Sequence, residues 1–258
     1  MRIALTIAGS DSGGGAGIQA DLKTFHRFGV FGTSVITAIT AQNTVGVRAW
    51  EAVGLDLVSG QLDAVAEDLR PHAIKSGMLA DERVTSRVAE GVRRHRLSPY
   101  VLDPVMVATS GDPLVSSDAV RAIRDELVPL ATLVTPNLDE ASILVDDEVT
   151  NEEEMILAAR RIVHDLGAQA ALVKGGHLAG PDTVDVFYDG TVHLVRHPRI
   201  DTTNTHGTGC TLSAAIAANL ALGAPLEEAV RTSLEFVHRA IATAPGLGSG
   251  HGPLNHFA

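Results

Sequence analysis

The sequence predicts an α/β fold in which helices cover both faces of a mostly parallel sheet. Along all 258 residues, short runs rich in β-branched and aliphatic residues alternate with longer segments of helical periodicity. Because these runs are apolar throughout, we expect the strands that they form to be buried on both faces. No linker rich in Ser, Pro or charge divides the chain, so we expect residues 1–258 to form one domain.

The strands and helices can be placed from these runs in chain order. The predicted strands are Ile3–Ala8, Thr33–Thr40, Ala73–Ser76, Tyr100–Asp103, Leu133–Thr135 and Ala170–Lys174. The predicted helices include Asp56–Leu69, Glu82–His95, Asp118–Leu127 and Glu152–Leu166. Ligands of open parallel sheets bind outside the carboxyl ends of the strands, so the residues that directly follow each strand are the candidates for a site.

Two local signals place the ends of the last of these helices. Thr150 and Glu153 have the spacing of a capping box, in which each side chain accepts a hydrogen bond from a free N–H at the helix start. Gly167 then provides the left-handed residue that commonly ends a helix.

A hairpin is predicted further along the chain. Val184–Tyr188 and Thr191–Val195 flank Asp189-Gly190, the dipeptide that best fits a two-residue hairpin turn. We expect this hairpin to add an antiparallel edge to the otherwise parallel sheet.

Composition and charge argue against several classes of function. The net charge is −11 and the pI is near 5.4, whereas nucleic acid and anionic membranes bind clustered Lys and Arg, so neither is expected as a partner. The single cysteine allows no internal disulfide and fits a reducing compartment. The apolar run at the N-terminus is interrupted by Ser10-Asp11-Ser12, so we expect no signal peptide and a cytoplasmic protein.

A Gly-rich segment, residues 9–17, follows the first predicted strand. Its glycines would let the backbone approach a ligand, and the alternative is a tight strand-to-helix turn without a ligand. The spacing is not that of a P-loop, and a dinucleotide site would require an acidic residue where the next strand ends in Ala41-Gln42-Asn43. Gln42 and Asn43 are amides that suit a neutral heterocycle, although loop amides often satisfy their own backbone.

The segment from Asn204 to Thr211 predicts an anion site. Its glycines precede an Ala-rich helix, Leu212–Leu222, and the free N–H groups and dipole at a helix start attract negative charge. Cys210 would lie in the first turn, where the pKa of a thiol is lowered, and could accept the proton of an attacking alcohol. The alternative is a small buried thiol that only packs.

Three further residues are expected at the same edge of the sheet. Asp103 and Glu140 follow strands and are oxygen ligands of the kind that Mg²⁺ prefers. Lys174 ends a strand and could reach a phosphate. Each of these residues alone is often structural, and their convergence favours a kinase that acts on a small, neutral, ring-containing alcohol.

Several motifs in order make the chain resemble the hydroxymethylpyrimidine/phosphomethylpyrimidine kinases, which belong to the ribokinase-like superfamily. The resemblance runs from Met1 to the C-terminus and rests on Ala8-Gly9-Ser10-Asp11, Gly17-Ile18-Gln19-Ala20-Asp21-Leu22-Lys23-Thr24, Val35-Ile36-Thr37-Ala38, Asp103-Pro104-Val105-Met106, Thr135-Pro136-Asn137 and Asn204-Thr205-His206-Gly207-Thr208-Gly209-Cys210-Thr211. It implies a three-layer α/β/α ribokinase-like fold and a homodimer. It also implies two successive ATP-dependent phosphorylations of 4-amino-5-hydroxymethyl-2-methylpyrimidine for thiamine biosynthesis, with Mg²⁺ as the metal. Whether a monovalent cation assists is left open.

The resemblance also implies roles for individual residues. Gln42 would pair with the aminopyrimidine edge, with Asp21 and Met78 in the same pocket. The anion hole would consist of Gly207, Thr208, Gly209 and Cys210, ATP would bind Lys174, Thr205 and Asn137, and the metal would bind Asp103 and Glu140. One departure is Thr109, where many members have Lys, so the second phosphorylation could be slower.

Three alternatives remain at this point. Pyridoxal kinase activity, alone or in addition, is the nearest because pyridine and pyrimidine alcohols share size and shape. A pyrimidine-binding regulator without catalysis would not need Asp103, Glu140, Lys174 and Cys210. A dinucleotide enzyme is disfavoured because the acidic residue is missing from the second strand.

Overall fold

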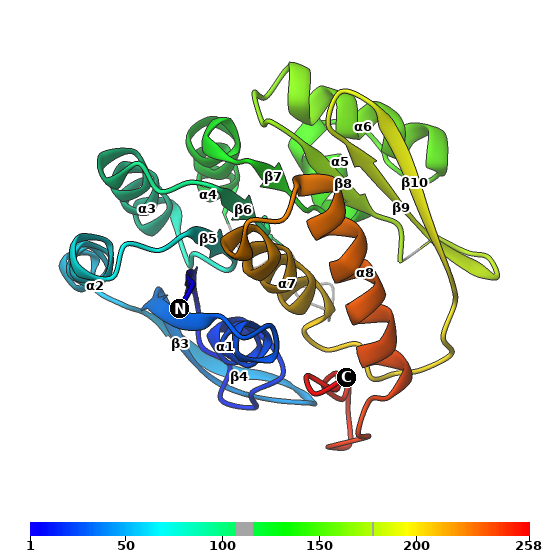
Figure 1. The fold of residues 1–258 in the computed structure, drawn as a ribbon, viewed down its shortest axis with the longest axis horizontal. Coiled ribbons are helices and arrows are strands. Elements are labelled where there is room, and N and C mark those ends of the chain that lie inside the picture. Colours follow the sequence, from blue (N-terminus) through cyan, green and yellow to red (C-terminus); the bar gives the residue numbers. More distant parts are fainter. Residues whose placement is uncertain (107–115, 177) are drawn as a thin grey trace.

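The computed structural model describes residues 1–106, 116–176 and 178–258 (Figure 1). Eight strands of the described residues form one sheet, in the order β10 (Val192–Pro198), β9 (Asp182–Tyr188), β8 (Ala171–Lys174), β7 (Leu133–Val134), β6 (Tyr100–Leu102), β5 (Ala73–Ser76), β1 (Ile3–Ala8) and β2 (Phe31–Ile36). The six strands from β8 to β2 are parallel, and β9 and β10 are antiparallel at one edge. This arrangement confirms the predicted parallel sheet with an antiparallel edge hairpin.

Helices cover both faces of this sheet, which confirms the three-layer prediction (Figure 1). One face carries α1 (Gly17–Arg27), α7 (Thr208–Leu222) and α8 (Leu226–Ala242). The other carries α2 (Leu55–Asp68), α3 (Glu82–His95), α4 (Ser117–Ala122), α5 (Leu138–Val145) and α6 (Glu152–His164). Within the described ranges, no helix combines the length and apolar character needed to span a bilayer.

The side chains of each buried strand alternate between two hydrophobic cores. Ala73 and Val101 pack toward α7 and α8, whereas Ile74 and Leu102 pack toward the opposite helical layer. Helix α7 is buried nearly all round, because its Ala-rich sequence lets α1, α8 and the sheet approach its backbone closely. The first turn of α7 is thereby fixed beside β5 and β6.

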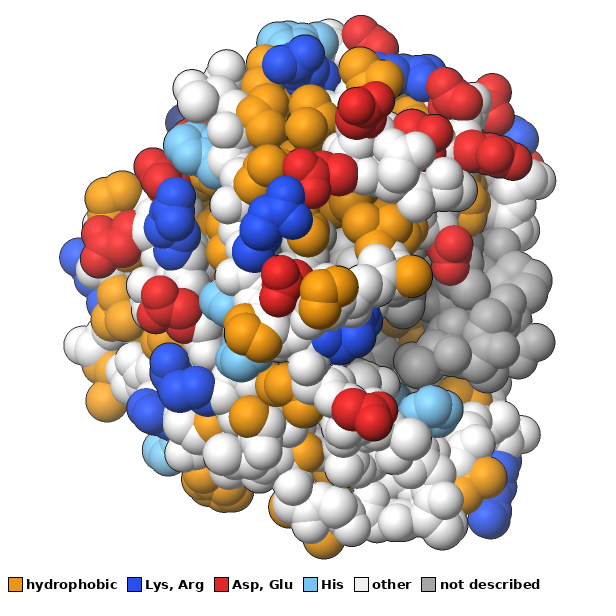
Figure 2. All heavy atoms as spheres, turned by 90° about the vertical axis from the view of Figure 1, so that its right-hand side faces the viewer, with side chains coloured by type: hydrophobic (Ala, Val, Ile, Leu, Met, Phe, Trp, Pro, Cys, Tyr) orange, Lys and Arg blue, Asp and Glu red, His pale blue; other side chains and the backbone are white. Residues whose placement is uncertain are grey.

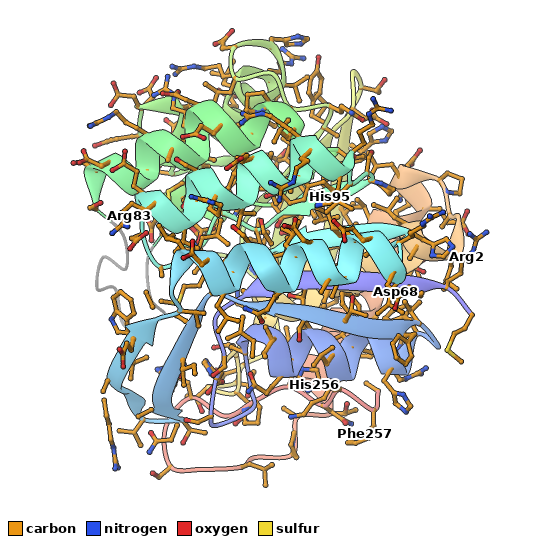
Figure 3. The ribbon with its side chains drawn as sticks, turned by 90° about the vertical axis from the view of Figure 1, so that its left-hand side faces the viewer. Arg2, Asp68, Arg83, His95, His256 and Phe257 are labelled. Carbon is orange, nitrogen blue, oxygen red and sulfur yellow. The ribbon has the colours of Figure 1, made fainter. Side chains whose placement is uncertain are left out.

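The prediction of one strand over Thr33–Thr40 is wrong. β2 ends at Ile36, and the chain continues as β3 (Ala38–Asn43), which pairs with β4 (Gly46–Ala52) in a separate antiparallel sheet that appears beside α1 in Figure 3. Thr37 marks the change: its hydroxyl donates to the Met78 carbonyl (2.7 Å) and its own carbonyl accepts from Val53 N–H (2.9 Å). These partners satisfy the backbone where it leaves the main sheet.

The predicted capping box at α6 is also wrong, by one residue. Asn151 caps the helix, accepting a hydrogen bond from Glu154 N–H (3.0 Å), and the Glu154 carboxylate accepts from Thr150 N–H (2.7 Å). Asn is at least as good an N-cap as Thr, so it takes the cap position. The left-handed glycine predicted after this helix is confirmed, since Gly167 has φ +85°.

Surface charge agrees with the acidic composition. Figure 2 shows Lys and Arg side chains interspersed with Asp and Glu over the face that carries β10 and α8. The visible, described part of this face therefore has no continuous basic patch of the kind that binds nucleic acid.

Candidate active site

The start of α7 presents free backbone donors. Gly207 caps the helix with φ +81°, and a Cβ there would lie 1.8 Å from the Gly15 carbonyl oxygen, so only glycine fits. Thr208 N–H donates to the Thr205 carbonyl (3.2 Å), whereas the N–H groups of Gly209 and Cys210 have no hydrogen-bond acceptor in the described part of the chain. Two free donors and the helix dipole form a site for an anion.

A lysine lies against these donors. Lys174, at the end of β8, has its Nζ 3.2 Å from Asp103 Oδ1 and 4.0 Å from Glu140 Oε2. A Cβ on Gly209 would be 3.1 Å from the same Nζ, so the ammonium lies directly beside the first turn of α7. Burial favours the neutral amine, but the carboxylates of Asp103 and Glu140 outweigh it and raise the pKa of Lys174.

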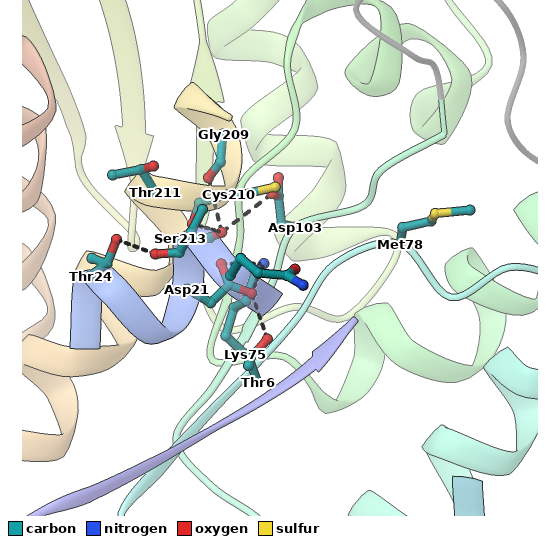
Figure 4. A network of polar contacts seen from close by, with 12 residues as sticks. Thr6, Asp21, Thr24, Lys75, Met78, Asp103, Gly209, Cys210, Thr211 and Ser213 are labelled. Carbon is teal, nitrogen blue, oxygen red and sulfur yellow. Dashed lines mark hydrogen bonds and ion pairs between the residues drawn. The ribbon is translucent and has the colours of Figure 1, made fainter. Parts of the chain in front are cut away.

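The three residues predicted to converge at this edge do so. Asp103 is buried after β6 and accepts hydrogen bonds from Lys174, Thr135 (3.4 Å) and Ser213 (3.3 Å). Ser213, one turn into α7, was not predicted, because its distance from Asp103 is 110 residues along the chain. Figure 4 shows Asp103 beside Gly209 and Cys210.

Asn137 and Glu140 hold each other in a capping box at the start of α5. Asn137 N–H donates to Glu140 Oε2 (2.8 Å), and Glu140 N–H donates to Asn137 Oδ1 (2.9 Å). Burial raises the pKa of Glu140 to about 7, with Lys174 opposing the rise and Asp103 adding to it. The Asn137 oxygen is thus already used by the helix cap.

These carboxylates are suited to a metal that is held mainly by phosphate. The described residues contain no group of three or more His, Cys, Asp or Glu side chains that could hold a metal ion. Mg²⁺ commonly binds one or two carboxylates together with water and the phosphates of a substrate. Asp103 and Glu140, which both face Lys174, fit that kind of site.

The predicted low pKa of Cys210 is wrong. The residue does lie in the first turn of α7, but burial raises the pKa of its thiol to about 11. Lys75 lowers this pKa, while Asp21 and Asp103 raise it further. The helix start can be predicted from sequence, but the burial and the two neighbouring carboxylates depend on contacts between distant segments.

Asp21 and Lys75 form an ion pair beneath this turn. Lys75 Nζ lies 3.0 and 2.8 Å from the two carboxylate oxygens of Asp21, and Thr6 donates to Asp21 at 2.5 Å. Both charged side chains are fully buried, so Asp21 does not line an open surface. Figure 4 shows Asp21 and Lys75 close to Thr6. Lys75 was not predicted, although a lysine inside the apolar strand Ala73–Ser76 was a visible signal.

The Gly-rich segment uses its backbone donors internally. The carboxylate of Asp11 accepts from the N–H groups of Gly13 (2.8 Å), Gly15 (3.0 Å) and Ala16 (2.8 Å). It also lies 2.9 Å from Nε2 of His206, which ties this loop to the segment before α7. Burial favours the neutral acid, but these partners outweigh it and lower the pKa of Asp11.

The remaining predicted residues lie around the same loop. Gln42, in β3, has one terminal atom of its side-chain amide 3.5 Å from His206 Nε2. Met78 follows β5 and is partly exposed; its sulfur would be 3.2 Å from a Cβ on Gly9. Thr205 forms the turn before α7, where its carbonyl accepts from the Thr208 hydroxyl (2.7 Å). Thr109 lies outside the described residues.

Comparison with known proteins reveals close similarity over nearly the whole chain. The model of the phosphomethylpyrimidine kinase family matches residues 11–255. The hydroxymethylpyrimidine/phosphomethylpyrimidine kinase of Rhizobium meliloti is 54% identical over 259 residues, covering 99% of this chain and 97% of that protein. The thiamine biosynthesis bifunctional protein ThiED of Geobacter sulfurreducens is 49% identical, covering 98% of this chain and 52% of that protein.

A solved structure shares the fold. The ADP complex of Bacillus subtilis pyridoxal kinase has a TM-score of 0.92 and 40% sequence identity, and covers 99% of this chain and 97% of that one. The predicted ribokinase-like fold is therefore confirmed.

Proposed function

Since the chain belongs to the phosphomethylpyrimidine kinase family, we propose that it phosphorylates 4-amino-5-hydroxymethyl-2-methylpyrimidine and then the resulting monophosphate, for thiamine biosynthesis. The observation that carries the proposal is the start of α7, where the free N–H groups of Gly209 and Cys210 lie beside the Lys174 ammonium. Residues 1–258 would act as one kinase domain.

The reaction transfers the γ-phosphoryl group of ATP. The hydroxymethyl oxygen forms a bond to the γ-phosphorus, the bond from that phosphorus to the bridging oxygen breaks, and ADP leaves with the electron pair. The hydroxyl proton passes to Cys210 when that residue is a thiolate. Charge that develops on the transferring group would be stabilised by the donors of Gly209 and Cys210 and by Lys174.

ATP and its metal would bind along the same edge. We assign Lys174, Thr205 and Asn137 to ATP and Asp103 and Glu140 to Mg²⁺, which would neutralise phosphate charge when bound. ADP in the similar pyridoxal kinase supports nucleotide binding by this fold. Replacing K⁺ by tetramethylammonium in the assay tests whether a monovalent cation assists.

The pyrimidine would bind between Gln42 and Met78. Both side chains are partly exposed, so a ligand can reach them. Gln42 lies against His206, in the segment before α7, and Met78 lies against Gly9. Asp21 is fully buried and bonded to Lys75, so we propose that it supports the floor of the pocket without lining its surface.

A homodimer is a further part of the proposal. The β3–β4 sheet carries exposed apolar side chains, including Ile39 (60% exposed) and Trp50 (46% exposed), and a second copy could cover them. Sedimentation equilibrium would give twice the monomer mass if this is right. We also propose that the activity is cytoplasmic, because the single cysteine fits a reducing compartment.

Pyridoxal kinase activity is the second candidate, favoured by the high structural similarity to a pyridoxal kinase.

The test of the pyrimidine kinase proposal is incubation with Mg·ATP and the aminopyrimidine alcohol, with the products followed over time by mass. A monophosphate that is then converted to a diphosphate supports the proposal, and a monophosphate that persists restricts it to the first step. Absence of any transfer to the pyrimidine contradicts it.

A further inference from the structure

Gln42 and His206 meet across 164 residues of sequence, beside the segment that precedes α7. One terminal atom of the Gln42 amide lies 3.5 Å from His206 Nε2, and the other lies 3.4 Å from the hydroxyl of Thr40. His206 Nε2 in turn lies 2.9 Å from Asp11 Oδ2. The amide therefore has a side-chain partner on each flank.

The proton on His206 decides which amide atom can face it. Asp11 accepts three backbone N–H groups and is an ionised acceptor, so the imidazole nitrogen beside it must carry the hydrogen. A protonated Nε2 has no lone pair left to accept a hydrogen bond from an amide N–H. The one hydrogen of Nε2 is directed mainly at Asp11 (2.9 Å), and the longer contact to Gln42 (3.5 Å) can share that hydrogen only with an acceptor. The Gln42 atom that faces His206 is consequently better matched as the oxygen.

The hydroxyl of Thr40 imposes the same orientation independently. Its only proton is donated to the Ser10 carbonyl at 2.8 Å, so toward Gln42 this hydroxyl can act only as an acceptor. The Gln42 atom that faces Thr40 must then be the nitrogen. Amide oxygen and nitrogen are assigned from their hydrogen-bond partners, and both partners here require the same assignment.

We propose that His206, held by Asp11, is a positioning residue that fixes the Gln42 amide with its oxygen toward the imidazole and its nitrogen toward Thr40. The backbone of Gln42 is already fixed, because the Ser12 hydroxyl donates to its carbonyl (2.7 Å) and accepts from its N–H (2.8 Å). One N–H and one oxygen lone pair of the amide then remain on the edge between the two flanks.

This remaining edge determines which ring is recognised. The amide N–H can donate to a ring nitrogen, and the adjacent amide oxygen can accept from an exocyclic amino group beside that nitrogen. A ring that lacks the amino group leaves the amide oxygen unpaired. The amino group of the pyrimidine, and not only its ring shape, is thus the feature selected. The inference rests on the proposed function, because it concerns the recognition of that substrate.

The test measures selectivity by calorimetry, without ATP. Dissociation constants are determined for the aminopyrimidine alcohol and for its analogue that lacks the amino group. We expect the wild-type protein to prefer the amino compound by about 10–100-fold, the effect of one unpaired buried polar group. His206→Leu and Thr40→Val should each reduce this preference to about threefold or less, and His206→Gln, whose amide can still donate to Asp11, should restore most of it.

A double-mutant cycle separates positioning from stability. In a Gln42→Leu background, His206→Leu should change the preference no further, because the group that it orients is gone. Equal weakening of both ligands by His206→Leu, with the preference intact, overturns the inference. A wild-type protein that binds both ligands equally also overturns it while leaving the kinase proposal standing. If the wild-type protein binds neither pyrimidine, the proposed function fails first.

Discussion

Lys75 from β5 donates to both carboxylate oxygens of Asp21 from α1, and neither side chain is exposed to solvent. Burial raises the pKa of Asp21. Burial also favours the neutral form of Lys75, but Asp21, Cys210 and Asp103 together outweigh it and raise the pKa of Lys75. Two opposite charges are thus buried beneath the start of α7, and each compensates the charge of the other.

Removal of one partner should therefore be costly. Lys75→Met leaves the Asp21 carboxylate buried without its cation, and we expect the free energy of unfolding to fall by about 3–5 kcal/mol. Urea denaturation measures this loss. Lys23→Met is the matched control, because Lys23 is exposed on the same helix as Asp21 and, within the described residues, its ammonium donates to the Gly14 carbonyl. Similar small losses in both variants would mean that the pair contributes nothing to the floor.

A methyl group at the anion site should impair catalysis. The Cβ of Gly209→Ala would lie 3.1 Å from Lys174 Nζ and 3.5 Å from Asp103 Oδ2, where the phosphates are expected. We expect kcat/KM for ATP to fall by about 10²-fold or more, as for loss of an oxyanion donor. Gly60→Ala is the control. Gly60 lies in the middle of α2 on its exposed side, and a Cβ there would meet nothing within 4 Å, so this substitution should raise stability by about 0.5–1 kcal/mol. Unchanged kinetics for Gly209→Ala would place the phosphates elsewhere.

The pH dependence of turnover tests the role of Cys210. With its pKa raised to about 11 by burial, only a small fraction is thiolate at neutral pH, and that fraction grows tenfold with each pH unit. If the thiolate accepts the hydroxyl proton, kcat should rise about tenfold per unit between pH 7 and 9, and Cys210→Ala should lose about 10²-fold in turnover. A flat profile together with full activity of the alanine variant would leave the thiol with a packing role only.

Acid should destabilise the protein through His256. This side chain is buried and faces the Thr211 hydroxyl at 3.2 Å. Figure 3 shows it beside α1. Burial lowers its pKa from 6.5 to about 4, so between these values only the unfolded chain takes up the proton. Stability should fall by about 3 kcal/mol as the pH drops from 6.5 to 4. His256→Gln should flatten this part of the stability curve, and an unchanged slope would contradict the assignment.

The layered fold could be predicted because its signals are local. Each buried strand is an uninterrupted apolar run, and the glycine stop at Gly167 and the hairpin turn at Asp189-Gly190 act over a few residues. The break between β2 and β3 could not be predicted, since it depends on a hydrogen bond from Thr37 to Met78, 41 residues away. A continuous β-branched run gave no sign of that partner.

In the candidate site, too, some features could be predicted from the sequence and others could not. Convergence of Asp103, Glu140 and Lys174 follows from their places at strand ends, which parallel order brings to one edge. The high thiol pKa of Cys210 and the contact of Asp11 with His206, 195 residues apart, require the packed structure. The sequence could predict that these three residues lie together but not the electrostatic environment of the candidate site.

A competition assay tests the central claim most directly. Equal concentrations of 4-amino-5-hydroxymethyl-2-methylpyrimidine and pyridoxal are incubated with the purified protein and limiting Mg·ATP, and every phosphorylated product is quantified by mass. We predict that the pyrimidine monophosphate accumulates first and that its diphosphate follows, with pyridoxal phosphate in the minority. Pyridoxal phosphate as the dominant product, with the pyrimidine left unmodified, would contradict the proposed function.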